Sequence, residues 1–385
     1  MSARAANARL VRSLKEIAPA EWDALANPPA APFNPFVSHD FLRCLEESGS
    51  AVARTGWQGA HLVLTDTDGK TIGLAPCYLK SHSYGEYVFD HGWAEAYERA
   101  GGDYYPKLQV SVPFTPATGP RLLAPTAELR SALADGLVAL CRQVSASSVH
   151  ATFLPGEDWQ ALGGTPWLKR QDIQFHWHNQ GYGSFDDFLA ALSSRKRKNI
   201  RKERETVREA GIEIDWVTGS DLKEHHWDAF FEFYMETGSR KWGSPYLTRR
   251  FFSLIGAAMA KHVLLVMCRR NGRIIAGALN FIGSDALYGR NWGATEHHDC
   301  LHFEACYYQA IEFAIAHKLK RVEAGAQGPH KLARGYVPAP TYSLHYLADP
   351  RLSRAVAEYL AREREAIGEE QEILAGHAPF READF

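Results

Sequence analysis

The hydrophobic pattern between residues 262 and 336 is the most regular part of the chain. Apolar residues alternate on both sides of Asn271-Gly272, and this dipeptide favours a tight hairpin because both central residues take positive φ. From Phe303 the apolar positions recur at offsets 0, 3, 4, 7, 8 and 11, which define one face of an α-helix. The segment therefore predicts a hairpin, a third strand, a helix that packs on the sheet, and a fourth strand.

A similar order of elements is predicted about 200 positions earlier, beginning at His61. It consists of a strand, a turn at Asp68-Gly69, a second strand, and a third strand with alternating aromatic residues. The counterparts of Gly272, Gly277 and Trp292 in this earlier copy are Gly69, Gly73 and Trp93. A single repeat at this distance is too long for a solenoid, whose period is about 20 to 50 residues. We interpret it as two copies of one α/β domain.

Length and composition agree with two globular domains. A chain of 385 residues exceeds what one core normally fills. Apolar residues make up 45% and charged residues 23%, and the formal charge is −2, so any polyanion site must be local. The N-terminus lacks an apolar signal region and no run approaches the length of a membrane span. Six single cysteines without a CxxC motif favour reduced thiols, and we expect a cytoplasmic protein without a membrane span.

The predicted domain boundaries follow turn-rich segments. The first domain, with an N-terminal lead-in, covers residues 1–165, the second, the candidate active domain, covers 166–349, and a C-terminal helix and tail cover 350–385. Ser38 and Thr126 are predicted N-caps of two helices in the first domain.

A basic helix over residues 195–208 is the strongest local deviation in charge. Arg197, Arg201, Arg204 and Arg208 share one face of this helix at offsets 0, 4, 7 and 11. Such a face neutralises phosphates, and the alternative is an ordinary solvated charged face.

A polar, glycine-rich loop over residues 323–336 is the second candidate site. Glu323 ends a predicted strand, and glycines at 325, 328 and 335 permit close approach of a ligand. The loop then brings four polar groups into one turn, namely Gln327, His330, Lys331 and Arg334. Loops at strand ends collect functional groups, although a plain exposed connection is the alternative.

Other chemistry has little support. His298 and His302 have the i, i+4 spacing of metal ligands, but the predicted helix begins only near Leu301, and we predict no metal site. Glu304, near the start of that helix, is placed to face the cleft. The sequence contains no GxGxxG after a strand, no GxxxxGK[ST], no GxSxG and no HExxH motif.

The order of predicted elements resembles the GNAT acyltransferase fold. Its repetition, with LSSRKRKNIRKE opening the second copy, resembles the Fem-type peptidoglycan aminoacyltransferases. HFEACYYQAIEFAI and GAQGPHKLARGY are similar to motifs of the FemAB-like, or peptidoglycan biosynthesis/recognition, proteins, and the resemblance extends from Asn34 to Phe380. It implies an α/β (α+β) fold of two tandem GNAT-like domains, each a mixed, mostly antiparallel sheet flanked by helices.

The resemblance also implies an enzyme that moves an acyl or aminoacyl group to an amine, such as that of a cell-wall precursor. The co-substrate would be acyl-CoA or aminoacyl-tRNA, with no tightly bound cofactor, and the acceptor a small-molecule or peptide amine. Arg334-Gly335-Tyr336 matches the basic residue and Gly-aromatic pair that line the Fem cleft. Catalysis is therefore assigned to Glu323 or His330 as base, to Lys331 or Arg334 as oxyanion or phosphate partner, and to Glu304. Substrate binding is assigned to Arg197, Arg201, Arg204, Gln327, Tyr336 and Trp292.

Two segments depart from the relatives that this resemblance suggests. WGATEHHDC stands where GNAT enzymes carry (Q/R)xxGx(G/A), and its Glu296 and Asp299 oppose a pyrophosphate at the helix start. The chain also passes from Glu209 directly to a strand, without the coiled-coil arm of tRNA-using Fem enzymes.

The alternative hypothesis is a non-catalytic recognition protein that binds a peptidoglycan precursor or nucleic acid through the basic helix. Fold analogy alone does not separate the two functions. The enzyme hypothesis requires that the basic helix and the polar loop lie on the same side of the second domain.

Overall fold

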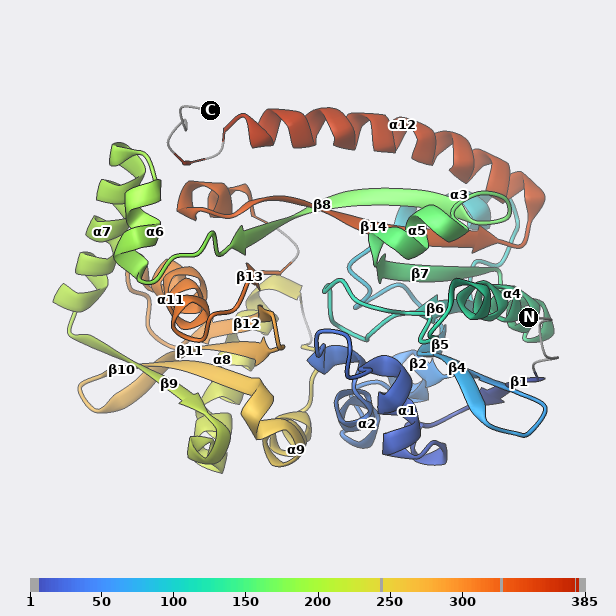
Figure 1. Ribbon diagram of the computed structural model, residues 1–385, viewed down its shortest axis with the longest axis horizontal. Coiled ribbons are helices and arrows are strands. Elements are labelled where there is room, and N and C mark those ends of the chain that lie inside the picture. The colour runs from blue at the N-terminus through green and yellow to red at the C-terminus, as the bar shows by residue number, and fades with distance from the viewer. Residues whose placement is uncertain (1–6, 243–244, 326–327, 378, 381–385) are drawn as a thin grey trace. The chain divides into compact units, whose positions relative to one another are not determined.

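We describe a computed structural model of the chain, and the structure describes residues 7–242, 245–325, 328–377 and 379–380. By internal contacts the chain divides into two compact units (Figure 1). Unit 1 comprises residues 1–172 and 340–369, and unit 2 comprises residues 173–339 and 370–385. The contacts thus assign residues 340–369 to unit 1. The boundaries predicted from the sequence had placed residues 340–349 in the second domain. The reason is that residues 342–347 pair with a strand of unit 1.

Unit 1 combines short strands with helices that cover them. Its strands are β1 (Asn7–Val11), β2 (Trp57–Gly59), β3 (His61–Thr65), β4 (Thr71–Ala75), β5 (Cys77–Lys80), β6 (Lys107–Val110), β7 (Ser148–Leu154) and most of β14 (Val337–Leu347). Its helices are α1 (Pro19–Ala26), α2 (His39–Glu47), α3 (His91–Arg99), α4 (Ala127–Gln143), α5 (Gly156–Leu162) and most of α12 (Pro350–Ala375). Ser38 and Thr126 accept hydrogen bonds from Phe41 N and Leu129 N at 3.3 Å each, which confirms both predicted caps.

Unit 2 has the same kinds of element. Its strands are the end of β8 (Leu168–His178), β9 (Ile212–Thr218), β10 (Val263–Arg270), β11 (Arg273–Ile282), β12 (Ala286–Ala294) and β13 (Arg321–Glu323). Its helices are α6 (Phe185–Ala191), α7 (Ser194–Glu209), α8 (Glu224–Trp242), α9 (Arg249–Met259), α10 (Leu301–Phe303), the π-helical turn η6 (Glu304–Tyr308), α11 (Gln309–Ala316) and the 3-10 helix η7 (Pro329–Arg334). The hairpin at Asn271-Gly272 is confirmed, with φ of 50° and 75°.

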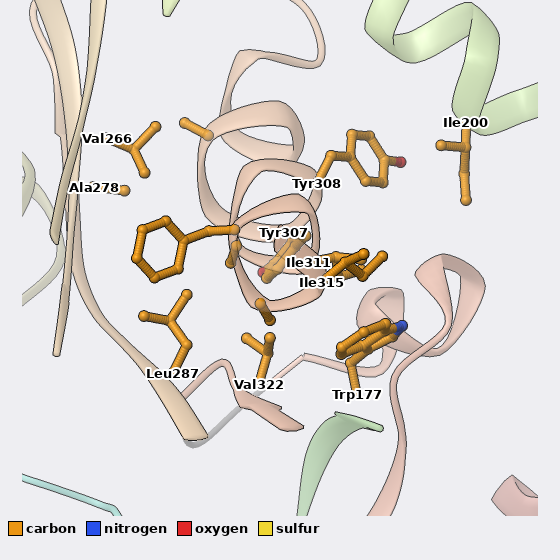
Figure 2. Packing of buried hydrophobic residues seen from close by; sticks show 14 of the residues in the cluster. Trp177, Ile200, Val266, Ala278, Leu287, Tyr307, Tyr308, Ile311, Ile315 and Val322 are labelled. Carbon is orange, nitrogen blue, oxygen red and sulfur yellow. The ribbon is translucent and has the colours of Figure 1, made fainter. Parts of the chain in front are cut away.

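We call α10, η6 and α11 together the 301–316 helix. It packs on one face of the unit 2 sheet. Figure 2 shows Leu287 and Val322 of the sheet beside Tyr307, Ile311 and Ile315 of the helix. These side chains belong to one buried cluster, which also anchors α7 through Ile200. The apolar face predicted from Phe303 onward is therefore the face that meets the sheet.

The two units share the pairing around their parallel strand pair, although the strands of unit 1 fall into two sheets. In unit 1, β1–β3–β4 and β2–β5–β6 are antiparallel, β7 is parallel to β6, and β14 is antiparallel to β7. In unit 2, β9–β10–β11–β12 is antiparallel, β13 is parallel to β12, and β8 is antiparallel to β13. A helix joins the parallel pair in both units, α4 in unit 1 and the 301–316 helix in unit 2. The shared topology is what an internal duplication produces.

The predicted third strand of the first copy is wrong. Residues 81–90 form turns and bends, and Trp93 lies inside α3. The third strand is β6, which begins at Lys107. The alternation of aromatic residues is misleading because the polar residues between them turn inward to the buried Lys107 instead of facing solvent.

Within the described residues, every helix is too short or too polar to cross a lipid bilayer.

Candidate active site

A small cavity lies where the parallel pair of unit 2 comes apart. β12 pairs with β13 over residues 286–288, opposite residues 321–323, and β12 then continues to Ala294. A cavity of about 90 Å³ borders this continuation. It is lined by Ala278, Leu279, Asn280, Gly289, Arg290, Asn291, Trp292, His302, Cys306, Tyr307 and Ala324. We call it the small cavity.

A second cavity adjoins the first. It measures about 440 Å³ and shares Trp292 and His302 with the small cavity. Its other lining residues are Glu236, Thr237, Ala294, Thr295, Glu296, His297, His298 and Leu301. This large cavity therefore surrounds the start of the 301–316 helix and leads toward the small one. The ring of His302 contacts that of Trp292 edge-on at 5.5 Å between centroids, at the junction of the two.

Backbone irregularities aim side chains into the small cavity. The pairing of β11 with β12 shifts register between Leu279 and Asn280, and such bulges re-aim neighbouring side chains. The amide of Asn280 is buried, with 1% of its surface exposed, and lines the cavity. On the opposite wall, residues Glu304–Tyr308 are π-helical. π-Helical turns are rare and are frequently found at functional sites.

Tyr307 and His330 form a pair at the wall of the small cavity. Tyr307 Oη lies 2.9 Å from His330 Nε2. The tyrosine is buried, which raises its pKa above the usual value and keeps the hydroxyl protonated, whereas His330 is exposed. The pair therefore connects the buried cavity to solvent through one hydrogen bond, which is a route along which a proton can leave.

Lys331 is buried beside this pair. Its exposed fraction is 2%, and Nζ donates one hydrogen bond to Gly325 O at 3.0 Å. Burial lowers the pKa of Lys331 to about 8, and the nearby thiol of Cys306 opposes this shift. Cys306 lines the small cavity, so the lysine contributes positive potential to that cavity.

Arg334 fixes the polar loop to α7 and to the 301–316 helix. Its guanidinium lies 3.4 Å above the centre of the Phe303 ring. Nη2 donates to both carboxylate oxygens of Glu203 at 2.9 and 3.1 Å, and Nη1 donates to His330 O at 2.9 Å. The hydroxyl of Tyr308 also donates to Glu203. Arg334 thus positions the backbone that carries His330, and α7 lies directly against the loop.

Family membership follows from comparison with known proteins. The sequence matches the FemAB-like family, described as peptidoglycan biosynthesis/recognition, over residues 13–382. This chain belongs to the FemAB-like family.

Solved structures agree with the fold. The chain is similar to FemX, with 12% identity, a TM-score of 0.57 and coverage of 89% of this chain and 98% of that one. It is also similar to L-PGS from Bacillus licheniformis, with 10% identity, a TM-score of 0.51 and coverage of 86% and 98%. At such identities the similarity shows the fold. A comparison with curated proteins gave no match.

The FemAB-like assignment confirms two predictions from the sequence. The fold is mixed α/β, with helices flanking the mixed sheets of both units. The enzyme class is that of acyltransferases. The donor, the acceptor and the roles of individual residues are treated as proposals below.

Two of the predicted site residues are engaged with each other. Arg204 Nη2 lies 3.0 Å from Glu304 Oε1 and 2.7 Å from Glu312 Oε2. Glu304 also accepts from Gln309 Nε2 at 2.8 Å, and 3% of its surface is exposed. Glu304 is absent from the described linings of both cavities, and its contacts fasten α7 to the 301–316 helix.

Glu323 lies on the other face of the sheet. Successive side chains of a strand point to opposite faces, and Val322 faces the 301–316 helix (Figure 2). Glu323 instead accepts from Arg321 Nε at 2.9 Å and lies 3.9 Å from His176 Nε2. The structure therefore separates Glu323 from His330, although both were predicted as alternative bases at one centre.

The remaining predicted residues are distributed around the site. Trp292 lines both cavities, and Tyr336 is buried against Tyr307 with ring centroids 5.5 Å apart. Arg201 lies on the exposed side of α7, 3.1 Å from Asp186, and Arg197 is half-buried on the same helix. Gln327 lies outside the described residues. A groove of about 510 Å³ follows α7 and is lined by Phe185, Asp186, Leu189, Arg201, Arg204, Glu205, Arg208 and Glu312.

The two histidines with the spacing of metal ligands contact other side chains. His298 Nε2 lies 2.9 Å from Glu296 Oε2, and His302 packs against Trp292. No group of three or more histidine, cysteine, aspartate or glutamate side chains is placed to hold a metal ion within the part of the chain that the structure describes.

Sequence reasoning missed Asn280, Cys306 and Tyr307. Tyr307 appears in the sequence as one of the apolar positions of a helical face, which predicts a core residue. Its hydroxyl contacts His330 only because the folded loop brings the two residues together. The pair Tyr307-Tyr308 carried a usable signal, since two adjacent tyrosines on one helix cannot both face the same side.

Proposed function

We propose that unit 2 transfers an acyl or aminoacyl group to an amine, with the small cavity holding the reacting carbonyl. The hydrogen bond between Tyr307 Oη and His330 Nε2 carries this proposal, because it links the cavity wall to an imidazole that can accept a proton. Membership of the FemAB-like family supports a peptidoglycan precursor as the source of the amine.

In the proposed reaction the amine loses a proton as its nitrogen attacks the carbonyl carbon. Tyr307 Oη accepts this proton while its own proton passes to His330 Nε2, so the tyrosine stays neutral throughout. A carbon–nitrogen bond forms, and the bond to the donor sulfur or ribose oxygen breaks. The proton returns from His330 to the leaving group or passes to solvent. Neutral His330 is required for the first step.

Asn280 and Lys331 are suited to stabilise the oxyanion. The buried amide of Asn280 lines the small cavity and donates a long bond, 3.4 Å, to Ala278 O. An amide N–H is a suitable donor to a carbonyl oxygen that gains charge. Lys331 adds a buried positive charge next to Cys306. Both groups are held in place before the substrate arrives, and this preorganisation is what makes such donors effective.

We propose that the phosphates of the donor contact α7 rather than the start of the 301–316 helix. Glu236 and Glu296 line the large cavity around that start and oppose a pyrophosphate. The exposed cations of α7 include Arg195, Lys198, Lys202 and Arg208. Glu203 on the same helix binds Arg334 of the polar loop, so these cations border the site. A long basic face favours aminoacyl-tRNA over acyl-CoA as the donor.

Tyr307→Phe tests the proton route. We expect turnover of acyl-CoA or aminoacyl-tRNA with an amine acceptor to fall by about 10²- to 10⁴-fold, because the relay is lost. Tyr308→Phe is the matched control, since the neighbouring hydroxyl bonds Glu203 on α7 and is absent from the linings of the two cavities. Equal turnover in the Tyr307→Phe variant and the native protein would contradict the mechanism.

Lys198→Glu combined with Lys202→Glu tests the donor site. We expect weaker binding of aminoacyl-tRNA and a shallower dependence of affinity on salt concentration, by about one unit of slope per lost contact. Binding of acyl-CoA would be unchanged if its phosphates lie elsewhere. If tRNA binds to α7 while no amine is acylated by any donor, the protein is a recognition module and the transferase proposal fails.

A further inference from the structure

Cys306 is one of two partly exposed cysteines in the chain. The other four cysteines are buried, namely Cys44, Cys77, Cys141 and Cys268. Burial raises the pKa of Cys268 to about 12, as is typical of an inert core thiol. Cys300, the other partly exposed cysteine, immediately precedes the 301–316 helix that carries Cys306. The two thiols can therefore be compared at one place in unit 2.

The surroundings of Cys306 are rich in positive charge. Cys306 lines the small cavity, and carboxylates are absent from the described lining of that cavity. The ionisable side chains around the thiol are a lysine, an arginine, a histidine and two tyrosines, namely Lys331, Arg290, His302, Tyr307 and Tyr336. Lys331 is buried, and within the described residues its ammonium group donates one hydrogen bond, to Gly325 O, although it has three donors. A thiolate at Cys306 would give this cation an anionic partner.

Tyr336 is a second buried polar group beside this thiol. It is fully buried, and its hydroxyl has no hydrogen-bond partner among the described residues. Its ring lies 5.5 Å from that of Tyr307, and its backbone N donates to Lys331 O at 3.3 Å. The hydroxyl also interacts electrostatically with Cys306. A buried hydroxyl without a partner costs free energy, which a bond to a thiolate, or to a polar group attached there, would recover.

Cys300 has the opposite electrostatic surroundings. Burial raises the pKa of its thiol, and the carboxylates of Glu203 and Asp299 raise it further. A neighbouring cation favours the thiolate, a neighbouring carboxylate favours the thiol, and the thiolate is the nucleophilic form. Of the two partly exposed cysteines, Cys306 is therefore the one whose surroundings favour reaction.

We propose that Cys306 is a reactive thiol, at which a small disulfide forms a reversible mixed disulfide that closes the small cavity. The thiolate attacks one sulfur of the small disulfide, and a new S–S bond forms as the original one breaks. The other half leaves as a thiolate and takes up the proton that the Cys306 thiol released. Cys306 is oxidised and the departing half is reduced, so no other oxidant is required. The effect on turnover rests on the transfer reaction proposed above, whereas the reactivity of the thiol does not.

Iodoacetamide labelling of the full chain over a series of pH values, read by peptide mass spectrometry, measures both thiols in one sample. We expect Cys306 to reach half of its maximal rate at least about one pH unit below Cys300. Lys331→Met should slow the labelling of Cys306 at neutral pH about three- to tenfold, because fewer molecules carry the thiolate although each thiolate is more nucleophilic. The rate at Cys300 should stay the same.

Coincident pH profiles of the two thiols, or an unchanged rate at Cys306 in Lys331→Met, would overturn the proposal. The buried Cys268 monitors folding in this variant. If Cys268 becomes reactive in Lys331→Met, the variant has lost its packing, and the two profiles of the native protein decide the question alone.

Treatment with 2-hydroxyethyl disulfide tests the closure of the small cavity. We expect the native protein to lose most of its turnover and to regain it with dithiothreitol, whereas Cys306→Ala should keep its own rate after the same treatment. Full turnover in native protein that carries the mixed disulfide at Cys306 would refute the closure. If the untreated protein acylates no amine, the transferase proposal fails, and the labelling result at Cys306 stands independently of it.

Discussion

The two units share the pairing around their parallel strand pair and differ at the end of that pair. In unit 2 a cavity lies beside β12 beyond its pairing with β13. In unit 1 a buried arginine fastens the loop that follows β6, the strand that pairs in parallel with β7. Arg121, with 1% exposure, donates from this loop to Thr152 O at 3.0 Å, Gly119 O at 3.1 Å and Ala117 O at 2.7 Å. The chain beyond the parallel pair thus borders a cavity in unit 2 and is held by a buried arginine in unit 1.

Their buried lysines show the same contrast. Lys107 of unit 1 contacts two carboxylates, whose charges raise its pKa despite complete burial. Lys331 of unit 2 contacts a carbonyl, and burial lowers its pKa to about 8. A lysine paired with carboxylates is a fixed structural charge. A lysine without such a partner is closer to neutrality at physiological pH, and is therefore suited to chemistry.

Lys107→Met should have the largest effect on stability. It leaves Asp90 buried without its lysine and Glu86 with only Lys80, at 3.8 Å, and breaking a buried pair in this way costs about 3–5 kcal/mol. We expect amide exchange in β5, β6 and β7 to accelerate, with little change in β10 to β12. Lys331→Met, which strands no carboxylate among the described contacts, is the comparison variant. Equal destabilisation by the two substitutions would refute the contrast between these lysines.

Arg121→Met should have the next largest effect. It leaves the carbonyl groups of Ala117, Gly119 and Thr152 without their guanidinium donor, which we expect to cost about 3 kcal/mol in the free energy of unfolding. The measurement is urea denaturation followed by fluorescence, with turnover as the second readout. Unchanged turnover per folded molecule is expected, because Arg121 belongs to unit 1 and the proposed reaction takes place in unit 2.

The stability of unit 2 should rise with pH above about 8 through Lys331. The folded-state pKa is lowered from 10.5 to about 8, so the unfolded state binds more protons between these values and deprotonation favours the folded state. The contribution is at most about 3 kcal/mol across this range. Because other groups titrate there too, the test is the difference between the native protein and Lys331→Met. A difference that stays constant from pH 8 to 10.5 would exclude the shifted pKa.

Gly289→Ala and Gly293→Ala should show the smallest and most selective effects. A Cβ on Gly289 would lie 3.4 Å from Asn280 Oδ1, an ordinary contact, so we expect a stability loss below about 1 kcal/mol. Its methyl group would enter the small cavity and lower turnover. A Cβ on Gly293 would lie 2.1 Å from Phe233 O and should destabilise unit 2 by about 1–3 kcal/mol. Normal turnover in Gly289→Ala would argue that the small cavity does not hold the acyl group.

Much of the fold was predictable because local chemistry and tertiary structure agree. Asn271-Gly272 specifies its hairpin through positive φ, and Ser38 and Thr126 specify helix starts through side-chain oxygens. The helical spacing after Phe303 identified the face that packs on the sheet. The prediction of the third strand in the first copy was wrong. Alternation of polar and aromatic residues does not reveal that the polar side chains bind the buried Lys107.

The sequence predicted which segments form the candidate site, but it did not predict which of their residues lie together. The sequence identified the polar loop, the basic helix and the start of the 301–316 helix, and the structure brings these three segments together in unit 2. It separates Glu323 from His330, because two positions on different elements share a site only if their elements face the same side. The side to which a strand residue points depends on which residues of that strand pack into the core.

The sequence alone determined most of the elements, their repetition and the family, since these depend on spacing and local conformation along the chain. Tertiary structure decided where the cavities of unit 2 lie, which lysine has carboxylate partners, and which tyrosine reaches His330. These features are contacts between residues far apart in the sequence, such as Tyr307 with His330 and Lys107 with Glu86. Their energies depend on burial and distance, which exist only once the chain has folded.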